Sequence, residues 1–378
     1  MQDNNGAPLD IHKLLKSVVA YKASDLHLVS RSEPQIRIDG RLVALNLPVL
    51  DGRDIEEMAY SLLTEKQKKT FEEYNELDFS IVIPDVGRFR ANYYKTMEDI
   101  ACAFRIIPVT IPSLDDLNAK KIFKSIIKRE KGLILVTGPT GSGKSTTLAA
   151  MLNEINMNEA RHIITVEDPV EYRMNLIQQV QVNPKVGLSF ADALRSILRQ
   201  DPDKIMIGEI RDHETLEIAV KAALTGHLVI STLHTNDAIS AIARMADMGI
   251  EPYLISGALV AVQAQRLVRK ICKFCKQEIE IPQTLLQEYS AYIPQGTVFY
   301  HGAGCKECNT TGYMGREMIC EVLPMSEELS SMIARGSSKE ELTKQAKKEG
   351  FVGMFENGMA KAVAGVTTLD EILRVAKV

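Results

Sequence analysis

The sequence lacks a long hydrophobic run and an N-terminal targeting signal. No apolar stretch approaches the roughly 18–20 residues that a membrane-spanning helix needs, so we expect no such helix. The N-terminus has no basic segment followed by an apolar one, so we expect no secretory signal. We also find no internal repeat and no low-complexity tract. Together these absences predict a cytosolic globular protein.

An excess of positive charge is missing as well. The net charge is −4 and the sequence pI is near 6.1, which argues against nucleic acid as the main partner but leaves a local basic patch possible. The hydrophobic share of 45% and the charged share of 25% are ordinary for globular proteins. At 378 residues the chain exceeds one compact core, so we expect two or three domains.

Residues 1–107 predict a small α+β domain. Apolar residues recur at helical spacing in Ile11–Tyr21 and Arg53–Lys68. Extended segments are predicted at Asp25–Val29, Gln35–Ile38, Leu77–Ile83, Gly87–Tyr94 and Ile100–Ile107.

Residues 108–130 predict a linker followed by a helix. Pro108, Pro112 and Ser113 interrupt the regular patterns. Leu114–Lys128 has helical spacing and carries a group of lysines, which most simply form a solvated face: Lys120, Lys121, Lys124 and Lys128.

Residues 131–325 predict an α/β domain, because strand-like apolar runs alternate with helical stretches. Such alternation indicates a parallel sheet with helices on both faces, and ligands bind at the carboxyl ends of its strands. The predicted strands are Leu133–Val136, Ile163–Val166, Ile205–Ile207 and Leu228–Ser231. Residues 326–378 predict a C-terminal helical region with helices at Ser326–Ala334, Ser338–Glu349 and Thr368–Ala376.

A phosphate-binding loop follows the first of these strands. The pattern G-x-x-x-x-G-K-[ST] is complete, and Thr146–Ile155 after it reads as a helix. Its glycines let backbone N–H groups curl around phosphate oxygens. Lys144 would reach the β- and γ-phosphates of ATP, and the Ser145 hydroxyl would hold Mg²⁺. The nucleotide-binding residues are Gly138, Pro139, Thr140, Gly141, Ser142, Gly143, Lys144, Ser145 and Thr146.

Two acidic residues follow other predicted strands. Glu209 comes after Ile205–Ile207 and could hold Mg²⁺ directly or through water. Glu167, followed by Asp168, ends Ile163–Val166 and could orient the attacking water. Either acid alone could be an ordinary surface residue, but two acids on adjacent strands beside a phosphate loop favour a catalytic role.

Histidines and arginines near these strands add further candidates. His227 and His234 flank the strand Leu228–Ser231 and could sense the γ-phosphate, or they could simply be hydrogen-bonded to the backbone. A nucleotide motor usually supplies an arginine to the γ-phosphate. The arginines near these strands are Arg195, Arg199 and Arg211, and their positions do not decide between them.

Four of the six cysteines form two C-x-x-C units separated by 29 residues. Two such units can enclose one tetrahedral Zn²⁺ with four sulfurs, and such a closed site is structural. Unrelated cysteines or a redox pair are the alternatives. The predicted ligands are Cys272, Cys275, Cys305 and Cys308, whereas Cys102 and Cys320 are expected to be packing residues.

The block Arg161–Ala238 resembles the core of the secretion ATPases that power type II secretion and type IV pili. The resemblance extends from Ala23–Leu28 to the end of the chain. The matching stretches within the block are Thr165–Tyr172, Leu194–Asp203, Gly208–Asp212, Thr225–His227 and Ser231–Asp237.

The resemblance implies a homohexameric ring of two-domain subunits that binds ATP between its domains. The small N-terminal domain would be PAS-like, and residues 131–325 would form a RecA-like P-loop domain with a zinc subdomain at about 270–312. By position, Glu167 would polarise the attacking water, Glu209 would belong to the second nucleotide motif, and His227 and His234 would bracket the His box. Arg90 and Arg105 are the N-terminal arginines expected to reach the γ-phosphate.

The two subfamilies of these ATPases share different features with the chain. The four cysteines and the segment Gly315–Glu321 resemble the assembly type, whereas the short N-terminal part, with no room for an extra docking domain, resembles the retraction type. We therefore expect a cytoplasmic ATPase motor, peripheral to the inner membrane, that moves pilus or pseudopilus subunits through a platform protein. Secretion or pilus extension is preferred. The alternatives are a pilus retraction ATPase, a conjugation-type nucleic-acid motor and a ring subunit without turnover.

Overall fold

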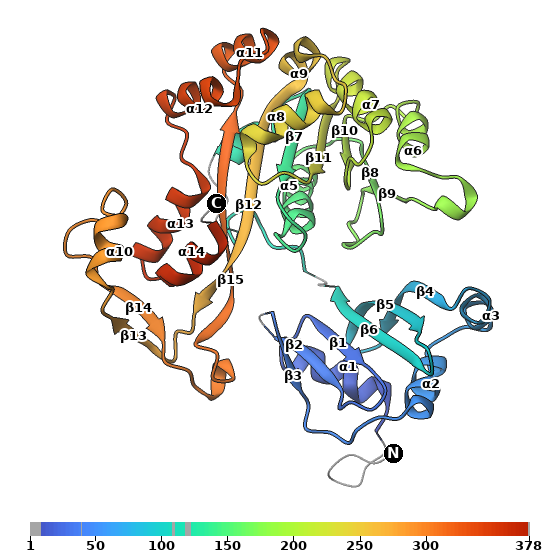
Figure 1. The fold of residues 1–378 in the computed structure, drawn as a ribbon. Helices are drawn as coiled ribbons and strands as arrows, with labels where there is room; N and C mark the ends of the chain where they lie inside the picture. Colours follow the sequence, from blue (N-terminus) through green and yellow to red (C-terminus); the bar gives the residue numbers. More distant parts are fainter. Residues whose placement is uncertain (1–8, 39, 108–109, 118–121, 377–378) are drawn as a thin grey trace. The chain divides into compact units, whose positions relative to one another are not determined.

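The structure, a computed structural model, describes residues 9–38, 40–107, 110–117 and 122–376 (Figure 1). The chain divides into two compact units, Met1–Thr110 and Ile111–Val378, called here the N-terminal and C-terminal units. Pro108, Lys120 and Lys121 of the predicted linker lie outside the described residues. The finer domain boundaries at residues 131 and 325 stay predictions.

The described part of the N-terminal unit is an α+β fold on a six-stranded antiparallel sheet of order β3-β2-β1-β6-β5-β4. Its strands are β1 (Asp25–Leu28), β2 (Gln35–Ile38), β3 (Arg41–Ala44), β4 (Glu76–Ile83), β5 (Gly87–Lys95) and β6 (Ile100–Ile107). Its helices are α1 (Ile11–Ala20), α2 (Gly52–Ser61) and α3 (Glu65–Tyr74).

The helix predicted over Arg53–Lys68 is two helices, so this expectation was wrong. α2 ends at Ser61, and Thr64 begins α3 by accepting a hydrogen bond from Gln67 N at 3.3 Å. Gln67 Oε1 in turn accepts one from Thr64 N at 2.9 Å, which completes a capping box. A threonine followed three residues later by glutamine is a helix-start signal, and here it interrupts a continuous apolar periodicity.

The C-terminal unit is built on a seven-stranded sheet of order β15-β12-β7-β11-β10-β8-β9, as its described residues show. The pairs from β12 to β9 are parallel, and β15 adds an antiparallel edge. Its strands are β7 (Gly132–Thr137), β8 (Ile163–Glu167), β9 (Gln178–Gln181), β10 (Lys204–Ile207), β11 (Leu228–Leu233), β12 (Leu259–Ile271) and β15 (Tyr313–Pro324). The strands β13 (Lys276–Ile279) and β14 (Phe299–Gly302) form a separate hairpin.

Helices cover both faces of this sheet, which confirms the predicted α/β architecture. On one face α4 (Ile122–Ile126) and α5 (Lys144–Asn158) share a buried cluster with the strands. The opposite cluster contains residues of the remaining helices that pack on the sheet, including the C-terminal ones. These helices are α6 (Phe190–Ile197), α7 (His213–Leu224), α8 (Ala238–Asp247), α9 (Pro252–Ala258), α11 (Glu327–Ala334), α12 (Lys339–Lys348), α13 (Met354–Val363) and α14 (Leu369–Ala376).

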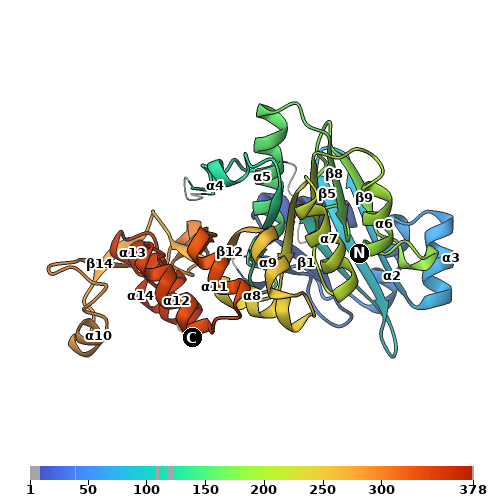
Figure 2. The same cartoon turned by 90° about the horizontal axis from the view of Figure 1, so that it is seen from above.

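Two parts of this unit differ from the sequence-based expectations. In the segment predicted as a helix over Leu114–Lys128, residues 114–117 form a turn and the described helix is only α4. Ser113 and Asp116 stabilise that turn, because Ser113 Oγ donates to Asp116 Oδ2 at 2.7 Å and accepts from Asp116 N at 3.1 Å. The long strands β12 and β15 were not predicted. They extend beyond the sheet to a lobe with β13, β14 and α10 (Gln283–Glu288), which Figure 2 shows on the side away from α6.

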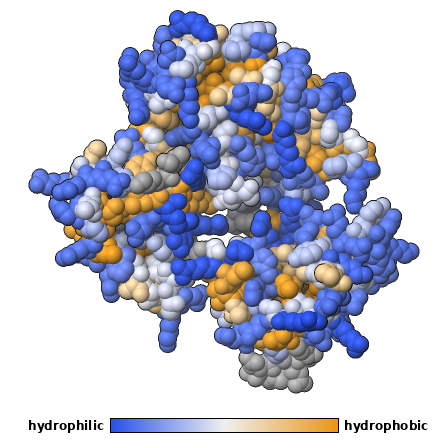
Figure 3. Space-filling view, viewed as in Figure 1, coloured by the Kyte–Doolittle hydropathy of each residue, from blue (hydrophilic) through white to orange (hydrophobic). Residues whose placement is uncertain are grey.

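The face of the molecule that Figure 3 draws is mainly polar. Figure 3 shows hydrophilic residues over most of one face, with hydrophobic residues in smaller patches between them. Within the described residues, none of the helices combines the length and the apolar character that a membrane span requires.

A buried ion-pair cluster fixes α14 to β12. The side chain of Glu371 is fully buried and accepts hydrogen bonds from Arg269 at 2.8 Å and from Arg374 at 2.6 Å. Burial opposes ionisation of this carboxyl group, but the two guanidinium groups outweigh it and lower the pKa of Glu371 to about 2.

We predict that Glu371→Gln destabilises the protein by about 3 kcal/mol, because it leaves Arg269 without its charge partner in a mostly buried place. Urea denaturation at pH 7 measures this. The exposed pair Glu328–Arg335 supplies the control, and Glu328→Gln should cost less than about 1 kcal/mol. Since the pKa of Glu371 is lowered in the folded state, its contribution is present above about pH 4.5 and disappears as the pH falls toward 2. An unchanged unfolding free energy in Glu371→Gln at pH 7 would contradict the prediction.

Candidate functional site

The predicted phosphate-binding loop joins the carboxyl end of β7 to the N-terminus of α5. Gly138, Gly141 and Gly143 have φ values of 145°, 78° and 88°, which residues other than glycine rarely adopt. A Cβ atom on Gly138 would lie 2.4 Å from the backbone oxygen of Gln265. The loop therefore needs glycine for both its backbone conformation and its close approach to β12.

Lys144 lies at the first position of α5 and folds over this loop. Its Nζ donates to the carbonyl oxygens of Gly138 at 2.9 Å and Pro139 at 3.1 Å. Burial lowers the pKa of Lys144, and the negative charge of Glu209 opposes that change. The ammonium group is thus close to both the loop and Glu209, where phosphate oxygens of a bound nucleotide would be better partners than two neutral carbonyls.

Glu209 lies at the carboxyl end of the sheet, just after β10. It forms an ion pair with Arg211, and the Nε2 atom of His234 is 3.5 Å from Glu209 Oε2. Arg211 also lies 3.8 Å from Asp168. Ser145 is exposed in the first turn of α5, beside Lys144. A hydroxyl and a carboxylate are oxygen donors of the kind that Mg²⁺ prefers, so the residues fit the predicted ion.

Glu167 is a buried carboxylate at the end of β8, the strand beside β10. The acids therefore lie on adjacent strands as predicted, although β11 separates them from β7. Burial raises the pKa of Glu167, and hydrogen bonds to Oε1 from Thr165 at 2.7 Å and Gln179 at 2.9 Å lower it in part. Such a carboxylate can accept a proton more readily than an exposed one, which suits a group that orients water.

A chain of hydrogen bonds links Glu167 to the phosphate loop. Gln179 Nε2 also donates to the carbonyl oxygen of Tyr172 at 2.7 Å, and the Tyr172 hydroxyl is 3.1 Å from Thr146 Oγ1. Sequence reasoning did not single out Gln179 or Thr165. Nothing marks Gln179 in the sequence, whereas Thr165 is two residues from Glu167 on the same strand and therefore shares its face.

Two further sequence candidates of this unit, His227 and Arg195, have their partners outside the site. His227 precedes β11 at the opposite edge of the sheet, where its Nδ1 is 3.1 Å from the Ala222 carbonyl oxygen and its own carbonyl accepts from Gly132 N. The alternative of a backbone-bonded histidine therefore describes His227, whereas His234 contacts Glu209. Arg195 pairs with Asp192 and Glu214 on the outer helices.

Arg90 and Arg105 belong to the N-terminal unit, where they face each other directly across β5 and β6. Arg90 pairs with Asp78 at 2.5 Å, and Arg105 pairs with the buried Asp25 at 2.7 Å. Both guanidinium groups thus lie on one face of the antiparallel sheet, held by carboxylates. Their role at a γ-phosphate stays a prediction.

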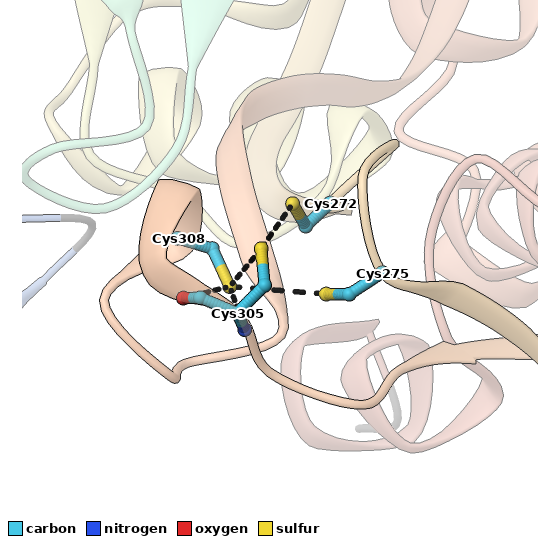
Figure 4. Close-up of side chains that lie close together, drawn as sticks. All are labelled: Cys272, Cys275, Cys305 and Cys308. Atoms are coloured by element: carbon cyan, nitrogen blue, oxygen red, sulfur yellow. Dashed lines mark hydrogen bonds between the residues drawn. The ribbon is translucent and has the colours of Figure 1, made fainter.

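The four predicted metal ligands converge on one point (Figure 4). Their sulfur atoms lie within 4.8 Å of one another, with separations of 3.8 Å for Cys272–Cys305, 3.8 Å for Cys275–Cys308 and 3.7 Å for Cys305–Cys308. Four sulfurs about 2.3 Å from a tetrahedral Zn²⁺ would be about 3.8 Å apart. The cysteines therefore fit this ion.

The backbone around the cysteines supports thiolate ligands. Cys305 N and Gly312 N donate to the sulfur of Cys308 at 3.2 and 3.3 Å, and such bonds stabilise a negative sulfur. Gly302 and Gly312 are so close that a Cβ atom on Gly302 would lie 1.9 Å from the Gly312 carbonyl oxygen. The remaining cysteines, Cys102 and Cys320, are buried away from the cluster, as expected.

A glycine-rich loop between a buried parallel strand and a helix, with acids at the ends of two further strands, defines the chain as a P-loop nucleotide-binding protein of RecA-like architecture. Comparison with known proteins gives the family. Residues 2–374 match the family described as Type II/IV secretion system protein, and the chain belongs to it.

Individual relatives agree with this assignment. The chain is 39% identical to the type IV pilus assembly ATPase PilB of Thermus thermophilus over 395 residues, which is 98% of this chain and 43% of that protein. It is also 39% identical to the type II secretion system protein E of Dickeya dadantii over 393 residues, or 97% of this chain and 75% of that protein. The crystal structure of the pilus retraction motor PilT with bound ADP has a TM-score of 0.76 and 33% identity, covering 98% of this chain and 97% of PilT.

We predict that Gly138→Ala abolishes detectable nucleotide binding, because the added methyl group would meet the Gln265 carbonyl oxygen and a φ of 145° is strained for alanine. Gly187→Ala is the control, since Gly187 has a φ of 78° but no atom within 4 Å of the added group and lies outside the loop. Titration with a fluorescent ATP analogue tests both variants. Equal affinities of Gly138→Ala and Gly187→Ala would contradict the assignment of this loop.

Proposed function

We propose that this chain is an ATP-hydrolysing motor subunit that drives the movement of pilus or pseudopilus subunits. The observation that carries this proposal is the convergence of the Lys144 loop, Glu209 and His234 at one edge of the parallel sheet, in a chain of the secretion family. Relatives that match nearly the whole chain are named as a pilus assembly ATPase and a type II secretion protein. The chain spans 43% and 75% of their lengths, so its activity and partners are inferred from them.

In the proposed reaction, water attacks the γ-phosphorus of ATP, the bond to the β,γ-bridging oxygen breaks, and ADP and phosphate are released. The loop N–H groups and Lys144 hold the phosphates, and Ser145 and Glu209 would hold Mg²⁺, which neutralises charge on the phosphate oxygens. Glu167 orients the water and accepts its proton. This role suits a buried carboxylate on β8, which pairs with β10, the strand that precedes Glu209. His234 contacts Glu209 and would respond to changes at the γ-phosphate.

We further propose a homohexamer in the cytoplasm, associated with the inner membrane through a platform protein. The family and its relatives support this arrangement. Secretion or pilus extension is preferred over retraction, because the chain is 39% identical to the assembly ATPase and to the secretion protein but 33% identical to PilT. A nucleic-acid motor is disfavoured by the net charge of −4, and we expect no direct nucleic-acid partner.

Lys144→Ala and Glu209→Gln should each lower the rate of ATP hydrolysis more than about 100-fold, because each removes a charge from the phosphate or Mg²⁺ site. Glu167→Gln should lower it about as much while leaving ATP bound. Phosphate release by the purified variants measures these effects. Glu217, whose side chain is 41% exposed, forms an ion pair with Lys221 on α7, so Glu217→Gln is the control. Wild-type rates in Lys144→Ala and Glu209→Gln would reject the site.

The cysteine cluster is proposed as a structural Zn²⁺ site. Its four sulfurs would complete the coordination of the ion, so it would stabilise the lobe and take no part in hydrolysis. The ion would join residues near the end of β12 to residues preceding β15, and so fasten together the two long strands that leave the sheet.

Metal analysis of the purified protein should find about one Zn²⁺ per chain. Cys275→Ser should lose the ion and lower the melting temperature of the C-terminal unit, because three ligands hold zinc more weakly than four. Cys102→Ala should retain the ion, since Cys102 lies in the N-terminal unit. A folded wild-type protein that contains no metal and binds no added Zn²⁺ would remove this part of the proposal.

A further inference from the structure

Two buried glutamines lie behind the phosphate loop, on β12. Gln263 and Gln265 are 0% and 1% exposed, although the other residues of the segment Leu259–Leu267 are mostly apolar. Because their positions differ by two, both side chains point to the same face of the sheet. Burying an amide group is costly unless its donors and acceptors are paired, so the partners of these side chains indicate why they are present.

Gln265 binds the loop on both sides of Lys144. Its Nε2 donates to the carbonyl oxygen of Ser142 at 2.8 Å, within the loop. Its Oε1 accepts from Thr147 Oγ1 at 3.0 Å, in the first turn of α5. The Cβ position of Gly143 lies 3.3 Å from Gln265 Nε2, so the amide also packs closely against the turn of the loop. One side chain from β12, which is far along the sequence but pairs with β7, thus fixes the segment that presents Lys144.

The bond to Ser142 also determines the direction of a backbone donor. In a trans peptide unit the C=O and the following N–H point in opposite directions. Because the Ser142 carbonyl group is turned toward Gln265, the N–H of Gly143 is turned away from Gln265. A donor to a phosphate oxygen must be turned away from its supporting strand in this way.

Gln263 has a different place in this cluster. Its Nε2 donates to Gln265 Oε1 at 2.5 Å and lies 3.5 Å from the sulfur of Met318 on β15. Among the described hydrogen bonds, none joins the Gln263 side chain to the loop. It has the residue type, strand, face and burial of Gln265 and contacts Gln265 itself, but it lacks the bonds of Gln265 to Ser142 and Thr147, so a comparison of the two isolates those bonds.

We propose that Gln265 is a positioning residue for nucleotide binding, which holds the phosphate loop in its binding conformation through Ser142 and Thr147. The proposal rests on the proposed ATPase function, because it assigns Gln265 to the same phosphate site. It predicts that loss of the amide group weakens binding of the triphosphate even though Gln265 does not itself touch the ligand.

The experiment compares Gln265→Met with Gln263→Met. Methionine has nearly the same shape as glutamine but cannot form these bonds, so both variants lose buried hydrogen bonds and both should have lower melting temperatures. Only Gln265→Met should raise the Kd of a non-hydrolysable ATP analogue with Mg²⁺, by about tenfold, whereas Gln263→Met should stay within about twofold of the wild type. Calorimetric titration measures the Kd values.

A second variant changes Thr147, the partner of Gln265 Oε1, and tests the proposal even if Gln265→Met does not fold. Thr147→Val retains the shape of the side chain but removes its bond to Gln265, and it should raise the Kd about threefold. In the double variant Gln265→Met/Thr147→Val the Kd should match that of Gln265→Met, because the two residues act through one contact.

The proposal is overturned if Gln265→Met binds the analogue as the wild type does, if Gln263→Met weakens binding equally, or if Thr147→Val leaves the Kd unchanged. The wild-type protein is measured in the same titration. Failure of the wild type to bind would count against the ATPase function, whereas wild-type binding with unaffected variants would count against the role of Gln265 alone.

Discussion

The parallel pairing of β7, β11, β10 and β8 is the constraint on which the site depends. In a parallel sheet all strands end at the same edge, so the pairing alone brings together residues that are far apart in the sequence. The register places Thr137 beside Leu233, Ser231 beside Ile207, and Ile207 beside Val166. Each part of the site lies at one of these strand ends or within two residues of it: the phosphate loop, His234, Glu209 and Glu167.

A second constraint comes from β12, which serves two sites at once. Gln265 near its middle binds the phosphate loop, and the strand ends at Ile271, directly before Cys272 of the cysteine cluster. Arg269 between them holds the buried carboxylate of Glu371 and so fixes α14. The sheet, the C-terminal helices and the cysteine lobe therefore share one continuous strand, and Figure 1 shows β12 and β15 running side by side from the sheet to the lobe.

The elements that could be predicted from the sequence are those whose signals are local. Apolar runs that end in a polar motif predicted β7, β8, β10 and β11, and the cysteine spacing predicted the four-cysteine cluster, because each pattern lies within a few residues. The residues that were missed depend on contacts across the fold. Gln179 and Gln265 contact Glu167 and the phosphate loop only because β9 and β12 bring them there.

The wrong expectations have physical reasons of the same kind. In Arg53–Lys68 the apolar residues continue at helical spacing, but a capping box at Thr64 and Gln67 divides the segment into two helices. Leu114–Lys128 also has helical spacing, but the hydrogen bonds between Ser113 and Asp116 form a turn at its start. Two glutamines in the apolar run of β12 were a visible signal of a buried polar contact, but the strand itself was not predicted. His227 could not be separated from His234 without the sheet, which places them at opposite edges.

We propose that the strand ends beside the phosphate loop form one site for a metal-bound triphosphate. A crystal structure of the chain with Mg²⁺ and a non-hydrolysable ATP analogue tests it most directly. We predict that Lys144 Nζ leaves the carbonyl oxygens of Gly138 and Pro139 and contacts the β- and γ-phosphates. Mg²⁺ should lie between the Ser145 hydroxyl group and the Glu209 carboxylate. A nucleotide bound elsewhere, or Lys144 still bonded to both carbonyl groups beside an analogue in the loop, would contradict the account.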